Sequence, residues 1–399
     1  MCNFSRAFFV IMIGFVVISC TNHRPIQVEV VSNLVQPGSG EPWLFTNPRG
    51  HVLFSWIERQ DTLNFFKLAV WQDNAWTEPR VMASGTDWFV NWADYPIAIS
   101  NGHDNYIAHF LKKSGEGIFE YDVSVITSPD GKTWSTPFTL HDDGKEAEHG
   151  FVSWIPYGEN FFVSWLDGRN TVIDDTTSHA DHDHHGEMSL RAAVLNTDGK
   201  KLDEWELDIC TCDCCQTTSA ITSNGPVVIY RDRSDEEVRD ISIVRLIDKQ
   251  WTKPKPVYQD NWEINGCPVN GPRCEAINNA LAIAWFTMAD NVPAVKVIFS
   301  ADGGETFDEP IRIDDGDPNG RVDLVMLDEN TALVSWMEGS QIRIVSVNKN
   351  GSKGKSIVVA SSSQARASGF PQLTKTKDGA MMAWTDEESK SIKTALIKW

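Results

Sequence analysis

The chain has 399 residues, of which 41% are hydrophobic and 23% charged, an ordinary globular composition that excludes a disordered chain, a collagen-like fibre and a bundle of membrane helices. Lys and Arg number 35 against 55 Asp and Glu, which gives a formal net charge of −20. No run of basic residues interrupts this acidic character. A nucleic-acid partner is therefore not expected, because binding to a phosphate backbone needs a positively charged surface.

The N-terminus begins with a short apolar segment, Ala7–Ile18, followed by Ser19 and Cys20. About a dozen residues are too few for a membrane-spanning helix, which needs about 20, so the segment predicts a cleaved export signal. The letters Val-Ile-Ser-Cys at 17–20 resemble a bacterial lipobox, whose cysteine becomes the lipidated first residue of the mature protein. An ordinary signal peptide with an incidental cysteine is the alternative.

These features predict three segments along the chain. We expect a lipoprotein signal peptide over 1–19, a tether over 20–26 that starts with lipidated Cys20, and one folded domain over 27–399. The protein would then lie at the bacterial cell envelope, exported, and would contact the membrane through its lipid alone.

A short apolar strand ending in an aromatic or polar residue recurs along the body of the chain. The repeats are spaced by about 55 residues, close to the length of a four-stranded propeller blade. No segment between them has a long helical period of apolar residues. The seven copies are 52–56, 106–109, 162–165, 227–230, 282–285, 333–336 and 381–384.

The second repeat shows the order of strands within one unit. We expect strands over 96–99, 106–111, 121–127 and 138–140, with turns at Asn101-Gly102 and Asp130-Gly131 between them. The unit is thus an antiparallel meander of four strands.

The last unit has three predicted strands, over 369–374, 380–384 and 391–397. Its missing outer strand is available at the other end of the body, in Gln27–Val31. The sequence therefore predicts an all-β fold, a seven-bladed β-propeller of four-stranded antiparallel blades closed by the N-terminal strand. A six-bladed propeller is the alternative.

Two turns carry a recognisable motif. Residues 300–307, Ser-Ala-Asp-Gly-Gly-Glu-Thr-Phe, match the Asp box of the sialidase superfamily, and 128–134, Ser-Pro-Asp-Gly-Lys-Thr-Trp, match it with one residue fewer. On these motifs the chain resembles sialidase-superfamily propellers with bacterial neuraminidase repeats, including exported ones that are called sialidase-like by analogy.

The resemblance implies a propeller fold and action on an acidic sugar, with Asp130 and Asp302 in structural roles. Two departures weaken the transfer of sialidase chemistry: seven repeats are present where sialidases have six blades, and the Arg-Ile-Pro segment is missing.

Strands of a meander alternate in direction, so the loops before the first strand and between the second and third share one face of the ring. That face collects polar residues that suit acid–base or nucleophilic catalysis, namely Asp94, Glu148, His149 and Tyr230, with Tyr95 as another nucleophile. Candidates for binding a carboxylate or sulfate are Arg169, Arg231, Arg233, Arg321, Arg366 and Asn270. Salt bridges that lock neighbouring blades together are the competing interpretation.

The cysteines form a cluster. Four of them lie within Cys-Thr-Cys-Asp-Cys-Cys at 210–215, and Cys267 and Cys274 follow. Export permits disulfides, but near neighbours are difficult to bridge without strain, so a metal site and a redox-active pair remain open beside disulfides. The candidate thiolate ligands are Cys212, Cys214, Cys215 and Cys267.

A long loop after Asp167 contains four histidines in seven residues, His179, His182, His184 and His185. Imidazole and thiolate are ligands that Zn or Cu accepts, although a solvated acidic insertion with no metal would have the same composition.

Three functions follow from these observations. The first is a propeller at the envelope that acts on or binds an acidic glycan or other small anion, with an exo-α-sialidase-like hydrolase as the enzymatic form of this function. The second is a metal-binding or redox protein, and the third is a non-enzymatic interaction scaffold.

Overall fold

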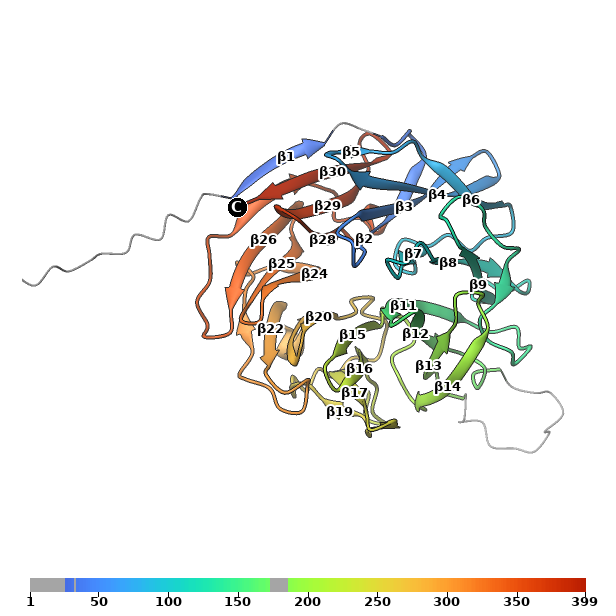
Figure 1. Ribbon diagram of the computed structural model, residues 1–399. Coiled ribbons are helices and arrows are strands. Elements are labelled where there is room, and N and C mark those ends of the chain that lie inside the picture. The colour runs from blue at the N-terminus through green and yellow to red at the C-terminus, as the bar shows by residue number, and fades with distance from the viewer. Residues whose placement is uncertain (1–25, 32–33, 173–185) are drawn as a thin grey trace, which may run out of the picture.

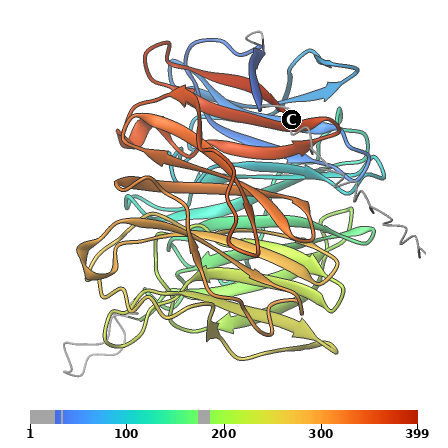
Figure 2. The same ribbon diagram turned by 90° about the vertical axis from the view of Figure 1, so that its left-hand side faces the viewer.

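The computed structural model describes residues 26–31, 34–172 and 186–399, which form seven antiparallel sheets arranged in a ring (Figure 1). Strands in each sheet follow one another from the axis outward, and in side view they run between the two ends of the ring (Figure 2). The described chain is thus a seven-bladed β-propeller, as predicted, and not the six-bladed alternative. The export signal, Cys20 and the four clustered histidines lie outside the described residues.

The first four blades follow in chain order. Their strands are β2 (Ser39–Thr46), β3 (Val52–Gln60), β4 (Leu63–Gln72), β5 (Ala75–Trp76) and β6 (Arg80–Gly85); β7 (Ile97–Ser100), β8 (Tyr106–Lys113), β9 (Tyr121–Ser128) and β10 (Phe138–Thr139); β11 (His149–Tyr157), β12 (Asn160–Asp167), β13 (Ser189–Leu195) and β14 (Lys201–Asp208); and β15 (Thr218–Thr222), β16 (Gly225–Arg231), β17 (Ile241–Ile247), β18 (Gln250–Trp251) and β19 (Lys255–Pro256). In blades 1 and 4 the outer edge is divided into two short strands, a departure from the predicted four.

The remaining three blades complete the ring. Their strands are β20 (Arg273–Ile277), β21 (Ala280–Thr287), β22 (Ala294–Ser300) and β23 (Ile311–Arg312); β24 (Pro318–Asp328), β25 (Thr331–Glu338), β26 (Gln341–Asn348) and β27 (Ile357–Ser361); and β28 (Gln372–Thr376), β29 (Gly379–Asp386), β30 (Ser391–Lys398) and β1 (Gln27–Val31). Short 3-10 turns form at η1 (Ala289–Asn291) and η2 (Arg366–Ser368). The described residues contain no helix long and apolar enough to cross a membrane.

The recurring apolar strand is the second strand of every blade. Its closing residue is almost fully buried in all seven copies, from 0% exposure at Trp56 to 5% at Trp384. Three of the buried tryptophans, Trp165, Trp285 and Trp336, donate their N–H to a nearby carboxylate, whereas the N–H of Trp56 has no hydrogen-bond partner. Trp165 donates to Asp167 and Trp336 to Glu338, each at 2.9 Å.

The N-terminal strand closes the ring. β1 pairs antiparallel with β30 over five residues, from Gln27 opposite Lys398 to Val31 opposite Thr394. It covers an edge that would otherwise expose unpaired amide and carbonyl groups (Figure 1). The first and last segments of the folded body therefore share one sheet, as the sequence predicts.

The two turns at 128–134 and 300–307 lie at the end of the ring away from the polar connectors. In each, the Asp carboxylate accepts hydrogen bonds from later backbone amides: Asp130 from Lys132 and Thr133, and Asp302 from Thr306. These carboxylates are occupied by their own turns, which agrees with a structural role.

Ring closure by β1 should contribute measurably to the free energy of unfolding. Replacing Gln27–Val31 by a Gly/Ser segment of equal length removes the pairing with β30, and at about 0.5–1.5 kcal/mol for each lost hydrogen bond we expect a loss of a few kcal/mol. Urea denaturation measures this loss, and size-exclusion chromatography reports association through the exposed β30 edge. Val30→Thr, at a side chain that is 66% exposed, is the control that should keep the wild-type midpoint. An unchanged midpoint for the Gly/Ser variant would contradict the role of β1.

Candidate functional site

The polar connectors gather at one end of the ring, which we call the hub face. It consists of the connectors that precede the innermost strands and those between the second and third strands of each blade. These connectors share one end because successive strands alternate in direction. Three groups of reactive side chains lie there: a carboxyl pair, a group of thiols, and a pair of histidines.

The carboxyl pair consists of Asp94 and Glu148, joined by the hydroxyl of Tyr121. The Tyr121 oxygen lies 2.8 Å from Glu148 Oε1 and 3.1 Å from Asp94 Oδ2. A phenol has one proton to donate, so it can serve only one of these two acceptors. The arrangement is fully hydrogen-bonded only when one carboxyl group is itself protonated and donates to the phenol oxygen.

The pKa values of this group fit that requirement. Burial raises the pKa of Asp94 to about 8, despite the hydrogen bond of 2.8 Å that the Phe151 amide donates to its Oδ1, and the negative charge of Glu148 adds to the rise. Burial also raises the pKa of Glu148 to about 7, with a further contribution from the charge of Asp213. Two carboxyl groups that titrate near neutral pH can give and take protons.

The backbone of β11 is shaped to admit Asp94. A Cβ atom at Gly150 would lie 1.9 Å from Asp94 Oδ2, so only glycine allows this approach. The next residue, Phe151, has a φ of +52° at a bulge in the pairing of β11 with β12. This conformation turns the Phe151 amide toward the Asp94 carboxyl group.

His149 does not join Glu148, although the two are adjacent in sequence. Neighbouring residues of a strand point to opposite sides, and the His149 ring instead stacks on His141 at a centroid distance of 3.6 Å. The structure therefore brings together Asp94 and Glu148 of the predicted catalytic set and separates His149 from them.

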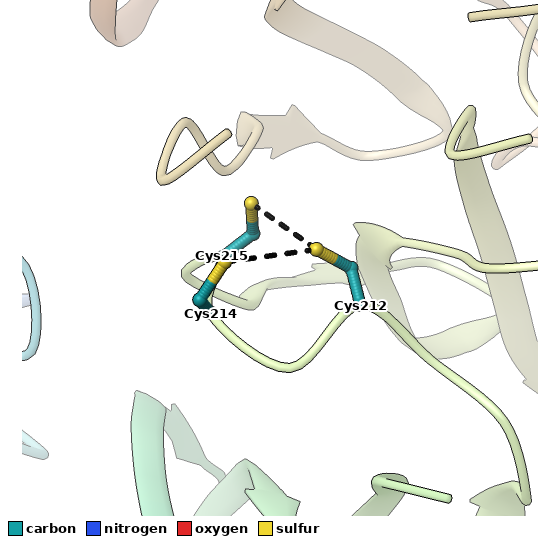
Figure 3. A group of neighbouring side chains, drawn as sticks. All are labelled: Cys212, Cys214 and Cys215. Carbon is teal, nitrogen blue, oxygen red and sulfur yellow. Dashed lines mark hydrogen bonds between the residues drawn. The ribbon is translucent and has the colours of Figure 1, made fainter. Parts of the chain in front are cut away.

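The thiol group lies on the connector between β14 and β15. Cys212 Sγ is 3.6 Å from Cys215 Sγ and 4.0 Å from Cys214 Sγ, and Figure 3 shows the Cys212 side chain pointing across the loop at the other two. Cys267, on the connector before β20, is close enough to Cys214 that their hydrogen bond lowers the pKa of the Cys267 thiol. Three of the four predicted thiolate ligands, Cys212, Cys214 and Cys215, thus form one group, and Cys267 lies beside Cys214.

The surroundings favour a thiolate at Cys212. Hydrogen bonding with the Cys214 and Cys215 thiols holds the pKa of Cys212 well below its ordinary value, and the charge of Arg231 adds to this. Arg239 Nη1 donates to Cys212 Sγ at 3.4 Å. Burial raises the pKa of Cys215 to about 12, so Cys215 keeps its proton while Cys212 is the thiol that ionises first.

The other two described cysteines are separate from this group. Cys210 Sγ donates to the carbonyl of Arg233 at 3.3 Å, and Cys274 Sγ lies 3.5 Å from Thr218 Oγ1. All six described cysteines are free thiols, and the sulfur separations given above are well beyond the roughly 2.05 Å of a disulfide. No three-disulfide framework is present among the described residues.

Two of the arginines predicted to bind an anion, Arg231 and Arg321, bind the backbone of the connectors in the structure. The Arg231 guanidinium is buried and donates to the backbone carbonyls of Arg239, Asn270 and Phe286 at 2.7–2.8 Å. Arg321 likewise donates to the carbonyls of 364, 365 and 369 and to Ser368 Oγ. Both guanidinium groups donate hydrogen bonds to carbonyl groups of the connectors, which cannot reach water in the packed hub. Neither guanidinium group is therefore free to hold an anion.

Most of the other predicted binding residues are also bound to partners, and Arg366 is the exception. Arg233 pairs with Glu187 and Glu237, and Arg169 forms two hydrogen bonds with Asp167. Arg366 is exposed, 6.0 Å from the Trp92 ring centre. Asn270 accepts from the Arg321 amide at 2.7 Å, and the Tyr230 hydroxyl donates to Asp208, away from the carboxyl pair. The competing interpretation, that such charges lock connectors and blades together, describes these contacts.

Sequence reasoning missed Tyr121, Arg239 and Arg273. The sequence predicts Tyr121 as the start of a strand, and nothing in its neighbourhood along the chain indicates that it contacts residues 27 positions away in both directions. Arg239 lies outside the Arg-Asp-Arg segment at 231–233 and carries no motif of its own. No local signal would have found Arg273.

Comparisons with known proteins show which solved structures have a similar fold. No family model and no curated protein matches the chain. Among solved structures it is similar to an α-L-arabinofuranosidase from Fusarium graminearum, with a TM-score of 0.52 and 12% identity over 92% of this chain and 98% of that chain. It is also similar to the NanB sialidase from Streptococcus pneumoniae, with a TM-score of 0.48 and 10% identity over 94% of each chain.

A third similar structure, the Hadza microbial sialidase Hz136, has a TM-score of 0.44 and 14% identity, over 75% of this chain but only 63% of that chain. Identities this low show a shared fold alone. The chain is a seven-bladed β-propeller, and its chemistry has to be argued from its own residues.

The buried carboxyl group at Asp94 predicts a pH dependence of stability. Its raised pKa, about 8, means that the folded protein keeps a proton that the unfolded chain releases near pH 4, so this group makes stability fall as pH rises between those values. Asp94→Asn should make that decline shallower, by up to about 1.4 kcal/mol per pH unit. Urea denaturation at several pH values from 5 to 8 would measure it, with the exposed Asp198→Asn as control. Equal slopes for wild type and Asp94→Asn would contradict the assignment.

Proposed function

We propose that this protein binds a thiophilic metal ion, Zn²⁺ or Cu⁺, through Cys212, Cys214, Cys215 and Cys267 on its hub face. The sulfur spacing carries the proposal. A Zn–S bond of about 2.3 Å in tetrahedral geometry places sulfurs about 3.8 Å apart. The separations of 3.6 and 4.0 Å around Cys212 bracket that value.

The charge around the thiols supports a metal–thiolate centre. Four thiolates and one Zn²⁺ leave a net charge of −2, which buried surroundings disfavour unless cations lie close. Arg239 contacts Cys212 directly, and the charge of Arg231 also acts on it. These two guanidinium groups supply the compensation, even though their remaining donors are bound elsewhere.

A metal ion can reach the thiol group from solvent, because two of its cysteines are not buried. Cys212 and Cys215 are almost fully buried, Cys214 is partly exposed and Cys267 is exposed. A site with four protein ligands leaves no open position for a substrate, so the proposed role is to hold or exchange metal and not to hydrolyse. We place this role at the cell envelope, on the strength of the export segment and the lipobox-like Cys20.

Metal analysis tests the centre. Protein prepared without an affinity tag should contain about one equivalent of Zn or Cu, and Cys212→Ser should lose it because Cys212 contacts both other sulfurs. Cys274→Ser is the matched control, since it removes a buried thiol outside the group and should leave the metal content unchanged. Metal-free wild-type protein with a Cys212–Cys215 disulfide, identified by mass spectrometry, would overturn the proposal in favour of a redox pair.

A second candidate function is carbohydrate chemistry at the carboxyl pair. Two observations favour it: the pKa values of Asp94 and Glu148 lie near neutrality, as an acid–base pair needs, and a similar propeller is an α-L-arabinofuranosidase. Because the arginines are occupied, this candidate is better matched to a neutral sugar than to the acidic glycan that the sequence suggested.

Incubation with a panel of neutral and acidic glycosides tests this candidate. If the pair is catalytic, Glu148→Gln should lower kcat by at least about 100-fold, since acid–base catalysis contributes 10²–10⁴. Glu146→Gln, two residues earlier and exposed, is the control that should retain activity. Absence of turnover by wild-type protein across the panel would remove the candidate without bearing on the thiol centre.

A further inference from the structure

A large cavity opens at the end of the ring opposite the hub face. It is bounded by the connectors β2–β3 and β28–β29 and by the turn between β4 and β5, and it has a volume of about 900 Å³. These connectors join first to second strands and third to outer strands, so they share their end of the ring with the turns at 128–134 and 300–307. The cavity therefore contains neither the thiol group nor the carboxyl pair.

The inner part of the cavity is held by hydrogen bonds to buried backbone. Glu275 of blade 5 and Lys375 of blade 7 line it there. Lys375 Nζ donates to the carbonyls of Met326 and Leu327, each at 3.1 Å, and the Glu275 carboxylate accepts a hydrogen bond from the Met326 amide. This part of the cavity is therefore already ordered before a ligand binds, which lowers the entropic cost of binding.

An aromatic ring forms part of the wall. Trp71, in β4, is half-buried, and its indole packs edge-on against Trp76, with ring centroids 5.2 Å apart and 69° between planes. Trp76 in turn packs against the fully buried Phe54 at 5.3 Å. The core of blade 1 thus holds the Trp71 indole in place where it lines the cavity.

The polar side chains near this indole have no partners within the described part of the chain. Those of Gln72, Asp73 and Asn74 form no hydrogen bond or ion pair there, and neither do those of Lys377 and Asp378 on the β28–β29 connector. The buried arginines of the hub face differ, because backbone carbonyls occupy them. In this cavity, donors and acceptors around an aromatic ring remain free for a ligand.

The lining is nearly balanced in charge, although the whole chain carries −20. Its charged members are four cations, Arg49, Lys375, Lys377 and Lys398, and three carboxylates, Asp73, Glu275 and Asp378. Two of the cations are paired with carboxylates outside the lining, Arg49 with Asp104 at 2.7 Å and Lys398 with Glu29 at 2.6 Å. A strongly charged ligand of either sign gains little from such a mixture. A neutral ligand that both donates and accepts hydrogen bonds fits it better.

We propose that this cavity binds a neutral oligosaccharide, with one sugar ring on Trp71 and its hydroxyls hydrogen-bonded to Asp73, Asn74 and Asp378. Each sugar hydroxyl both donates and accepts, and the C–H groups on one side of the ring form an apolar surface that packs on an indole. The volume lies within the range of about 300–1,000 Å³ that ligand sites occupy. The site needs neither the proposed metal centre nor the carboxyl pair.

Isothermal titration calorimetry of the full-length protein tests the site. The neutral probes are maltotriose, cellotriose, xylotriose and arabinotriose, and sialyllactose is the charged probe. We expect saturable binding of at least one neutral trisaccharide, and Trp71→Ala should lower its affinity at least about 10-fold because the ring contact is lost. Asp378→Ala, at an exposed position without partners in the described chain, should lower it about 2–10-fold through a lost hydrogen bond.

Trp205→Ala is the matched control. Trp205 is also half-buried and packs edge-on against Trp251 at 5.8 Å, but it lies in blade 3 outside the cavity, so its loss should leave the affinity at the wild-type value. If Trp71→Ala fails to fold by circular dichroism, Asp378→Ala decides the question.

Wild-type protein that binds none of the neutral probes, or binds sialyllactose alone, would overturn the inference. Unchanged affinity in both Trp71→Ala and Asp378→Ala would do the same, and a loss of that binding in Glu148→Gln would then place the sugar at the carboxyl pair. Neither result depends on the metal content of the protein, so failure of this site is distinct from failure of the thiol centre.

Discussion

The buried guanidinium of Arg273 is the interaction around which the hub is organised. It begins β20 in blade 5, lies 5.2 Å from the ring centre of Trp43 in blade 1, and donates to Gln372 in blade 7 at 3.2 Å. It also bonds the Tyr95 hydroxyl beside blade 2 and lies 3.8 Å from Asp323 in blade 6. A buried cation must keep its partners, so this one side chain ties five of the blades to a common centre.

Closure around that centre explains why the arginines of the hub face bind backbone. Connectors that enter the innermost strands lose access to water, and their carbonyl groups then need donors from the protein. Arg231 and Arg321 each present several N–H groups in a fixed fork, which suits several carbonyls at once. The guanidinium groups of Arg231 and Arg321 are therefore held by the backbone, whereas the pKa values of Asp94 and Glu148 lie near neutrality.

The reactive groups are divided by strand geometry. Glu148 and His149 are consecutive, yet one meets Tyr121 and the other stacks on His141, because alternate side chains of an extended strand leave on opposite sides. The connector between β14 and β15 also separates its cysteines, here through its turns and not through strand alternation. Cys212 joins Cys214 and Cys215, while Cys210 turns to the carbonyl of Arg233.

The sequence by itself determined the architecture. Each blade repeats the same short strand, and that periodicity, with the spare strand at Gln27–Val31, was sufficient to predict seven blades and their closure. It also identified the three cysteines that form one group, because Cys212, Cys214 and Cys215 lie within four residues and have little freedom to separate. Only the tertiary structure decided which polar residues face one another. Tyr121, His141 and Arg273 find their partners across blades, and such contacts depend on how the ring closes and on the side to which each residue points, neither of which leaves a local pattern in the chain.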